Sequence, residues 1–370
     1  MEDRKLKIAI LGSQGIPAKF GGFETFTEQL ATRLAQRSFS VTVFCEAEDD
    51  NNPDTYKGVS LKHIKTPKIT AIRSIWFDTV SILKCLGKYD VIYMLGYSVA
   101  FAFFLPRIFG DKFLVNMDGL EWKRTKWSAF AKRYLHAMEH LATSLATVAI
   151  ADAEGIADHL IKQYGSPEKV VMIPYGADVI ITTPDSKKLI SFGLEAGNYY
   201  LVVCRLEPEN HVLEIIRGFS QTTSRRKLVI IGDHHVDTAY TRALTGQNDE
   251  RIVFLGTVFD QEKLAALRYY CYTYLHGHSV GGTNPSLLEA MACGNFVVAH
   301  DNVFNREVTQ NKGWYFNDIL EVRQQVEKLE TEGIPLGAAA EFQDIVRKKY
   351  NWDVIADSYA ELFRRLSYKG

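Results

Sequence analysis

Short apolar runs alternate with amphipathic stretches along most of this 370-residue sequence. The run at Lys7–Leu11 ends at Gly12, and Phe23, Phe26 and Leu30 then follow at helical spacing, as expected for a strand and the helix after it. Repeated strand–helix units predict a mostly parallel sheet with helices on both faces. The further strands are expected at 41–45, 59–64, 90–95, 113–117, 146–150, from 199 onward, at 227–231 and at 252–255.

The length of the chain favours two hydrophobic cores, because single cores rarely grow beyond about 250–300 residues. The loop IPYGAD at 173–178 and the polar stretch up to Gly197 interrupt the alternation, so we interpret them as a linker. A second series of strands and helices begins at Tyr199. In such domains, ligands gather at the carboxyl ends of the parallel strands.

Composition and charge exclude several classes of protein. The chain has 43 Lys and Arg against 44 Asp and Glu, a net charge of −1, which argues against a general nucleic-acid binder. Its five cysteines are scattered without metal-ligand spacing, as in reduced intracellular proteins. The N-terminus lacks the apolar region of a signal peptide, so we expect a cytoplasmic protein. The longest apolar run, 91–105, falls short of the roughly 18–20 residues that span a bilayer, and predicts a buried strand followed by a buried helix.

The stretch HGHSVGGTNPSLLEAMACG, residues 276–294, carries the strongest indication of a ligand site. It predicts a strand end, a glycine turn and a helix that begins at Pro285, with Thr283 or Asn284 as its N-cap. Free backbone N–H groups at a helix start favour an anion, so a phosphate would fit against Gly282, Thr283 and Asn284. An ordinary strand-to-helix corner is the alternative interpretation.

This stretch resembles the donor-site segment of retaining GT-B glycosyltransferases, in which a helix carrying LEAMACG holds a nucleotide sugar. The resemblance implies two Rossmann-like domains whose parallel sheets face a central cleft, and a carboxylate, here Glu289, on the ribose hydroxyls. The family usually has a second Glu eight positions earlier, where this chain has Gly281, so backbone N–H groups or Asn284 are expected to replace its contact with the donor sugar. The implied donor-binding residues are Arg205, Val258, Ser279, Gly281, Gly282, Thr283, Asn284 and Glu289.

The same fold implies a division of the chain by role. Residues 1–180 would form the acceptor-side domain, and residues 185–351 the domain that binds the nucleotide sugar. The last helix, within 352–370, would cross back to the first domain.

The opening segment GIPAKFGGFETF, residues 15–26, is similar to the N-terminal signature of a bacterial subgroup that includes rhamnosyltransferases of polysaccharide assembly. Its Gly21 and Gly22, with Glu24 close by, are expected to face the acceptor or the donor pyrophosphate; a plain helix cap is the alternative. The glycines here do not fit the G-x-G-x-x-G fingerprint. Glu46 also follows Gly12 by more than the usual ~20 residues, so an NAD site is disfavoured.

The segment NMDGLEWKRTKW, residues 116–127, stands at the end of another expected strand. Asp118 and Glu121 lie in a Gly-containing turn, which suits binding of sugar hydroxyls or orientation of a nucleophilic one. DGLEWKR also matches the subgroup, although both carboxylates could serve only as turn and N-cap residues. The basic and aromatic side chains from Trp122 to Arg133 suit either a solvated helix face or contact with anionic lipid headgroups.

A cation for the leaving diphosphate is expected at Arg205, where the family has Arg. The family's Lys position is Asn210 here, so Arg205 and the helix start at Thr283 would carry more of the phosphate charge. An ion pair with Glu207 or Glu209 is the alternative role of Arg205.

A zinc site at His276 and His278 lacks a third ligand of suitable spacing, so polar lining of the donor pocket is the better interpretation. Helix-start N–H groups and Arg205 can stabilise the leaving pyrophosphate without a metal. We therefore expect no metal and no other cofactor, with a nucleotide diphosphate sugar as co-substrate.

The function that this resemblance implies is a retaining, metal-independent hexosyltransferase with Asp118 and Arg205 as catalytic residues. The subgroup implies transfer of L-rhamnose from dTDP-rhamnose to a saccharide or lipid-linked saccharide. Such a reaction would serve a bacterial surface polysaccharide, O-antigen or capsule, at the inner face of the membrane. The alternatives are a nucleotide-sugar epimerase, against which the acceptor-side residues argue, and a non-catalytic nucleotide-sugar binder, against which Asp118 argues.

Overall fold

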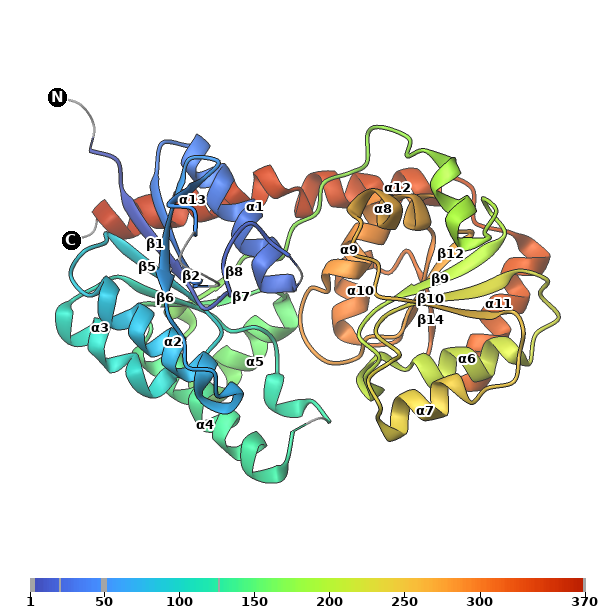
Figure 1. The fold of residues 1–370 in the computed structure, drawn as a ribbon, viewed down its shortest axis with the longest axis horizontal. Helices are drawn as coiled ribbons and strands as arrows, with labels where there is room; N and C mark the ends of the chain where they lie inside the picture. The colour runs from blue at the N-terminus through green and yellow to red at the C-terminus, as the bar shows by residue number, and fades with distance from the viewer. Residues whose placement is uncertain (1–3, 20, 48–51, 126, 369–370) are drawn as a thin grey trace. The chain divides into compact units, whose positions relative to one another are not determined.

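The chain divides into two compact units, and each is built around its own sheet (Figure 1). The computed structural model describes residues 4–19, 21–47, 52–125 and 127–368. The first unit consists of Met1–Lys123, Trp127–Tyr175 and Trp352–Gly370, and the second consists of Arg124–Lys126 and Gly176–Asn351. The predicted fold class, an α/β protein with two Rossmann-like domains on parallel sheets, is confirmed.

The strands described in the first unit are β1 (Lys7–Leu11), β2 (Ser40–Glu46), β3 (Thr55–Tyr56), β4 (Val59–Ile64), β5 (Val91–Leu95), β6 (Phe113–Asn116), β7 (Val148–Ala151) and β8 (Val170–Met172). They form one sheet in the order β3-β4-β2-β1-β5-β6-β7-β8, in which only the pairing of β3 with β4 is antiparallel. Residues 8–11 of β1 have no exposed surface, because helices cover both faces of the sheet.

The helices described in the first unit are α1 (Gly22–Gln36), α2 (Thr70–Cys85), α3 (Phe104–Phe109), α4 (Ala129–Leu145), α5 (Glu154–Tyr164) and α13 (Trp352–Tyr368). Figure 1 shows α2, α3, α4 and α5 on one face of the sheet and α1 with α13 on the other. Short 3-10 turns at Ala100–Ala102 and Glu121–Lys123 follow β5 and β6.

The C-terminal helix α13 is part of the first unit's core. The hydroxyl of Tyr359 on α13 and that of Tyr93 on β5 are hydrogen-bonded at 2.8 Å. Phe363 has no exposed surface and stacks edge-on against Tyr93. Arg37, at the end of α1, forms an ion pair of 2.6 Å with Asp357. The last residues of the chain therefore complete the domain that its first residues begin.

The strands described in the second unit are β9 (Tyr199–Val203), β10 (Lys227–Ile231), β11 (Ile252–Gly256), β12 (Thr273–His276), β13 (Val297–His300) and β14 (Trp314–Phe316). They form an entirely parallel sheet in the order β11-β10-β9-β12-β13-β14. Its helices are α6 (Val212–Ser220), α7 (Ala239–Thr245), α8 (Gln261–Tyr269), α9 (Pro285–Ala292), α10 (Val303–Thr309), α11 (Ile319–Glu332) and α12 (Ala338–Ile345).

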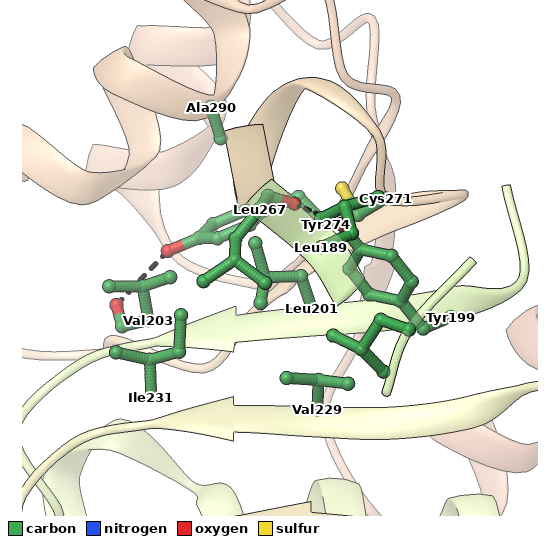
Figure 2. Close-up of a cluster of buried hydrophobic side chains, with 11 residues drawn as sticks. Leu189, Tyr199, Leu201, Val203, Val229, Ile231, Leu267, Cys271, Tyr274 and Ala290 are labelled. Carbon is green, nitrogen blue, oxygen red and sulfur yellow. Dashed lines mark hydrogen bonds between the residues drawn. The ribbon is translucent and has the colours of Figure 1, made fainter. Parts of the chain in front are cut away.

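A buried cluster between this sheet and helices α8 and α9 forms one half of the second core, and Figure 2 shows its side chains. Leu267 of α8 and Ala290 of α9 pack on Leu201 of β9. Two tyrosines keep their hydroxyls satisfied within it: Tyr199 donates to the carbonyl of Leu267 at 2.6 Å, and Tyr274 donates to that of Val203 at 3.1 Å. Buried polar groups that are paired in this way add specificity without an unsatisfied donor.

The apolar run 91–105 is only partly as predicted. Its strand, β5, is buried, but the expected buried helix is not. The helix α3 begins at Phe104, and the side chains of Phe104, Ile108 and Phe109 are 46%, 72% and 60% exposed. The helix has six residues, and Pro106 is the only one of them that is buried.

The boundary between the units lies at Tyr175–Gly176, because the backbone from Gly176 onward is bonded within the second unit. The N–H of Ala177 donates to the carbonyl of Tyr350 at 2.7 Å, and that of Ile180 donates to Ala292 at 3.2 Å. Within the described part of the chain, helices are too short or too polar to cross a bilayer.

Candidate active site

The corner between β12 and α9 has the predicted form. The strand ends at His276, and α9 begins at Pro285. The N-cap is Asn284, whose side chain accepts a hydrogen bond of 2.9 Å from the N–H of Ser286. Leu287, Leu288 and Met291 have no exposed surface, so the predicted buried stripe is confirmed. The start of the helix is therefore fixed at the carboxyl edge of the sheet.

Gly277 allows the loop before α9 to lie directly on the turn that follows β9. A Cβ atom at this position would be 1.9 Å from the carbonyl oxygen of Asn210, so no other residue fits without a backbone shift. His211 bonds the carbonyl of Gly277 through Nδ1 at 2.9 Å. Ser279 donates to the carbonyl of Glu209 at 3.0 Å from both its N–H and its hydroxyl. These contacts bring two loops together that are about 70 residues apart in the sequence.

Asn210 links the predicted phosphate-binding arginine to this glycine loop. Its side chain is 4% exposed; Nδ2 donates to the carbonyl of Arg205 at 2.7 Å, and Oδ1 lies 2.8 Å from Nδ1 of His278. Sequence reasoning treated Asn210 only as the place of a missing cation. Its role in positioning depends on contacts with residues far along the chain, which no local pattern indicates.

Arg205 keeps its guanidinium in solvent, where a ligand can reach it. Its side chain is 61% exposed, and the ion pair with Glu207 is long, at 3.8 Å. Exposed pairs of this kind contribute little to stability. Glu209, the other proposed partner, instead accepts a 2.7 Å hydrogen bond from the hydroxyl of Thr125, a residue of the same unit. The alternative ion-pair role of Arg205 therefore survives only as this weak contact with Glu207.

Glu289, the predicted ribose ligand, has a protein partner that sequence reasoning missed. Its Oε2 forms a short ion pair with Arg268, which extends from α8 and has a side chain only 8% exposed. The Glu289 side chain is 37% exposed, so its carboxylate reaches solvent while Arg268 holds it from behind. A carboxylate can accept about four hydrogen bonds, which leaves capacity for a ligand. The sequence signal that could have indicated this ion pair is Arg268, which follows the apolar residues of α8.

The histidines of this corner are held neutral. Burial lowers the pKa of His276 well below its ordinary value. Burial, together with the charges of Arg124 and Arg205, lowers the pKa of His278 to about 4. The pKa of His300 is also lowered to about 4, by burial and by the positive charge of His211, on which its ring stacks. Nε2 of His276 is buried and has no hydrogen-bond partner among the described residues. At neutral pH these rings therefore offer polar surface without charge.

The remaining predicted donor residues are placed as follows. Gly281 has a positive φ of 115° in the turn before α9, next to Gly282, and Thr283 is 4% exposed. Val258 follows β11 at the far edge of the sheet and packs against the cluster in Figure 2. Across the described residues, groups of three or more His, Cys, Asp or Glu side chains suited to a metal ion do not occur. Metal independence stays a prediction.

In the first unit, the predicted acceptor residues Gly21, Gly22 and Glu24 form the turn into α1. Gly21 is the N-cap residue, with φ of 102°, and a Cβ atom there would lie 2.1 Å from Oε2 of Glu24. The other oxygen of Glu24 accepts from the N–H of Gln14 at 2.9 Å. Glu24 thus closes the loop after β1 on itself, and its carboxylate lines a cavity of about 300 Å³ together with Glu46.

Asp118 and Glu121 lie in the turn after β6. The N–H of Asp118 donates to Oδ1 of Asn116 at 2.8 Å, and its φ of 35° is in the left-handed region. Oε1 of Glu121 accepts from the indole of Trp127 at 3.0 Å. Neither Asp118 nor Glu121 is among the residues that line the cavity beside Glu24. The five predicted acceptor-side residues therefore lie in two separate turns of the first unit, one that leads into α1 and one after β6.

Two family models match the chain. Residues 187–332 match glycosyl transferases group 1, and residues 5–178 match a domain of unknown function, DUF1972. The second unit therefore contains a group 1 glycosyltransferase domain. The whole chain is 22% identical to an uncharacterized glycosyltransferase of Methanocaldococcus jannaschii, over 98% of the chain and 99% of that protein.

Solved structures with the same fold cover almost the whole chain. Sucrose-phosphate synthase from Thermosynechococcus elongatus matches with a TM-score of 0.83 at 17% identity, over 99% of this chain and 100% of that one. HepE of Anabaena, solved with UDP and glucose, matches with a TM-score of 0.79 at 18% identity, over 97% and 100%. Trehalose 6-phosphate synthase from Burkholderia multivorans matches with a TM-score of 0.71 at 12% identity, over 99% and 97%. The fold is therefore GT-B.

Proposed function

We propose that this glycosyltransferase moves a sugar, with retention and without a metal, from a nucleotide diphosphate sugar to a hydroxyl group of a saccharide or lipid-linked saccharide. The observation that carries the proposal is the corner between β12 and α9, where Asn210 ties the Arg205 turn to the loop before the helix. This arrangement offers helix-start N–H groups and an exposed guanidinium at the edge of one sheet.

The chemistry of this corner suits a leaving diphosphate. Negative charge grows on the diphosphate as the bond to the sugar breaks, and preorganised donors stabilise that charge most strongly in the transition state. Arg205 supplies a permanent positive charge, and the start of α9 supplies N–H groups and the helix dipole. The neutral rings of His276 and His278 add polar groups to this corner without adding charge.

The nucleoside end of the donor would lie against Glu289. A carboxylate fixed by Arg268 can accept hydrogen bonds from both hydroxyls of a ribose, and the ion pair keeps it oriented. The structural relative HepE was solved with UDP and glucose, and with UDP-glucose, which supports this class of donor. The GIPAKFGGFETF signature favours dTDP-rhamnose as the donor and a bacterial surface polysaccharide, such as O-antigen or capsule, as the product.

The acceptor would bind the first unit, with Asp118 orienting the attacking hydroxyl and the departing phosphate able to take its proton. The side chain of Asn116 accepts a hydrogen bond from the N–H of Asp118 and so holds the turn that carries this carboxylate. The second unit would be the donor-binding domain and the first the acceptor-binding domain, in a protein that works at the cytoplasmic face of the membrane.

A donor panel tests the proposal. Thermal unfolding would be followed with UDP, dTDP, UDP-glucose and dTDP-rhamnose, where saturation at 100 times the dissociation constant raises stability by about 2.7 kcal/mol. Turnover with a saccharide acceptor, read by NMR of the anomeric configuration, should show retention and should continue in EDTA. Inverted product, a strict Mg²⁺ requirement, or epimerised donor without transfer would each overturn the corresponding part of the proposal.

A further inference from the structure

The helix α2 is apolar on both of its faces, which is unusual for a helix on the surface of a sheet. Toward the sheet it buries Phe77 and Ile82, which are 3% and 0% exposed. Ile72 and Trp76 lie one helical turn apart on the side away from the sheet, and they are 47% and 52% exposed. Leu83 continues the same outward stripe at 50% exposure. An apolar stripe of this length has no core to face within the first unit.

The neighbouring helix extends this apolar surface. Figure 1 shows α3 beside α2 on the same face of the first sheet. Phe104, Ile108 and Phe109 of α3 are all exposed, and Ile108 is the most exposed of the three. Single exposed apolar residues need no explanation, but contiguous patches mark interaction sites. We name this surface the α2–α3 face and define it by Ile72, Ile75, Trp76, Phe104, Ile108 and Phe109.

The segment that carries the α2–α3 face is rich in positive charge. Residues 61–112 contain eight Lys or Arg but only three acidic residues, whereas the whole chain is almost balanced. One of these acidic residues, Asp78, is buried, at 7% exposure. The other two have partners: Asp90 forms an ion pair with Arg4, and Asp111 accepts a hydrogen bond from the N–H of Gly87. The exposed cations Lys84, Lys88 and Arg107 therefore have few carboxylates near them in the sequence to balance them.

The exposed part of the basic and aromatic segment after β6 lies next to this face. Phe130, near the start of α4, is 82% exposed. The hydroxyl of Tyr134 on α4 donates to the carbonyl of Ser98, just before the 3-10 turn that leads to α3. Trp122, in contrast, is turned inward, because its indole N–H donates to the buried carboxylate of Glu139 at 2.9 Å. Phe130, and not Trp122, is thus exposed enough to meet a partner surface.

We propose that the α2–α3 face docks the protein onto an anionic lipid bilayer, with its apolar side chains in the headgroup region and Lys84, Lys88 and Arg107 on lipid phosphates. Aromatic and aliphatic side chains flanked by cations are the chemistry of an interfacial anchor. A second copy of this chain is a poorer occupant, because two identical cationic faces would repel each other. The proposal does not depend on the identity of the sugar donor.

Vesicle flotation tests the docking surface. Wild-type protein should float with phosphatidylcholine vesicles that contain phosphatidylglycerol, and at least tenfold more weakly with phosphatidylcholine alone. The double variant Trp76→Ser/Ile108→Ser should lose at least tenfold in partition coefficient on the charged vesicles. In the variant Lys84→Ala/Arg107→Ala, the partition coefficient should fall about fivefold for each cation removed. This loss should occur only on charged vesicles and should be smaller at high salt.

The second unit offers a matched control. Ile181 and Leu336 are 95% and 106% exposed, so Ile181→Ser/Leu336→Ser removes the same kind of surface elsewhere and should float like wild type. Equal loss in both double variants would overturn the proposal, as would no loss in either. Thermal unfolding and nucleotide binding of each variant show that its fold is intact.

Two further measurements separate lipid from a second copy. Brominated phosphatidylcholine should quench a component of the tryptophan fluorescence that is missing in Trp76→Phe, since only a membrane-inserted ring comes close to bromine. Sedimentation velocity without lipid should show the same species for wild type and Trp76→Ser/Ile108→Ser. If wild type is an oligomer that this variant dissociates, or if quenching persists in Trp76→Phe, the face is not a lipid-docking surface.

Discussion

At the scale of single residues, the pair formed by Glu289 and Arg268 decides how the donor site can be tested. Arg268 is 6% exposed, so removing its partner leaves a buried charge without compensation. A simple substitution of Glu289 therefore changes both the fold of the second unit and any contact with a ribose. The two effects need separate variants.

We predict that Glu289→Gln lowers the stability of the second unit by about 1–3 kcal/mol and also weakens nucleotide binding. The double variant Glu289→Gln/Arg268→Met removes the unpaired charge and should recover much of the stability, as measured by urea unfolding. Nucleotide affinity, measured by calorimetry, should stay low in that double variant. If affinity returns along with stability, Glu289 supports the fold and does not contact the ribose.

The backbone N–H of Asp118 is bonded to Asn116, and an asparagine at this position can keep that bond and the shape of the turn. Asparagine tolerates the left-handed region better than most residues, and Asp118 has a φ of 35°. We predict that Asp118→Asn keeps the wild-type melting temperature and nucleotide affinity but transfers sugar at least about tenfold more slowly, because the attacking hydroxyl loses its orientation. Steady-state kinetics with donor and acceptor measure this. Wild-type turnover would reduce Asp118 to a turn residue.

At the scale of elements, the corner between β12 and α9 depends on histidines that stay neutral. His278 bonds Asn210 while its pKa is lowered to about 4 by burial and by the charges of Arg124 and Arg205. A histidine in the unfolded chain titrates near 6.5. Between pH 6.5 and pH 4, His278 therefore binds more protons in the unfolded chain than in the folded one. The stability that comes from keeping this ring neutral is fully present above pH 6.5 and is lost as the pH falls to 4.

We predict that His278 alone lowers the free energy of unfolding of the second unit by up to about 1.4 kcal/mol for each pH unit below 6.5. Urea unfolding at pH 7, 6 and 5 measures the slope. His278→Gln keeps a side chain that can bond Asn210 but does not titrate, so its stability should change less over the same range. An identical slope in both proteins would show that His278 does not control this dependence.

At the scale of the whole molecule, the C-terminal helix α13 belongs to the unit that contains the N-terminus. Phe363 has no exposed surface and stacks with Tyr93, so its removal leaves a cavity in the first unit. We predict that Phe363→Ala lowers the free energy of unfolding of the first unit by about 3–5 kcal/mol. Hydrogen exchange should rise in β5 and α1, with the strands of the second unit protected as before. Equal loss of protection in both units would contradict the division of the chain.

Much of the fold could be predicted from local pattern. The runs at Lys7–Leu11 and Val59–Ile64 are strands with the predicted bounds. The first is apolar from Ile8 to Leu11 because both faces of the sheet are covered there, whereas the second alternates buried Val59 and Leu61 with exposed Ser60 and Lys62. The start of α9 at Pro285 was also predictable, since capping chemistry acts over a few residues. The family resemblance at 276–294 agreed with the group 1 glycosyltransferase match, whereas the choice of rhamnose stays a proposal.

The sequence by itself determined most of the strands and the start of α9, because these depend on periodicity and capping within short windows. It also indicated two α/β domains. Only the tertiary structure decided that Arg268 holds Glu289, that Asn210 joins the Arg205 turn to the glycine loop, and that α3 is exposed. Periodicity shows which residues share a face of an element. Whether that face is covered, and by which distant side chain, depends on packing between elements that no local pattern records.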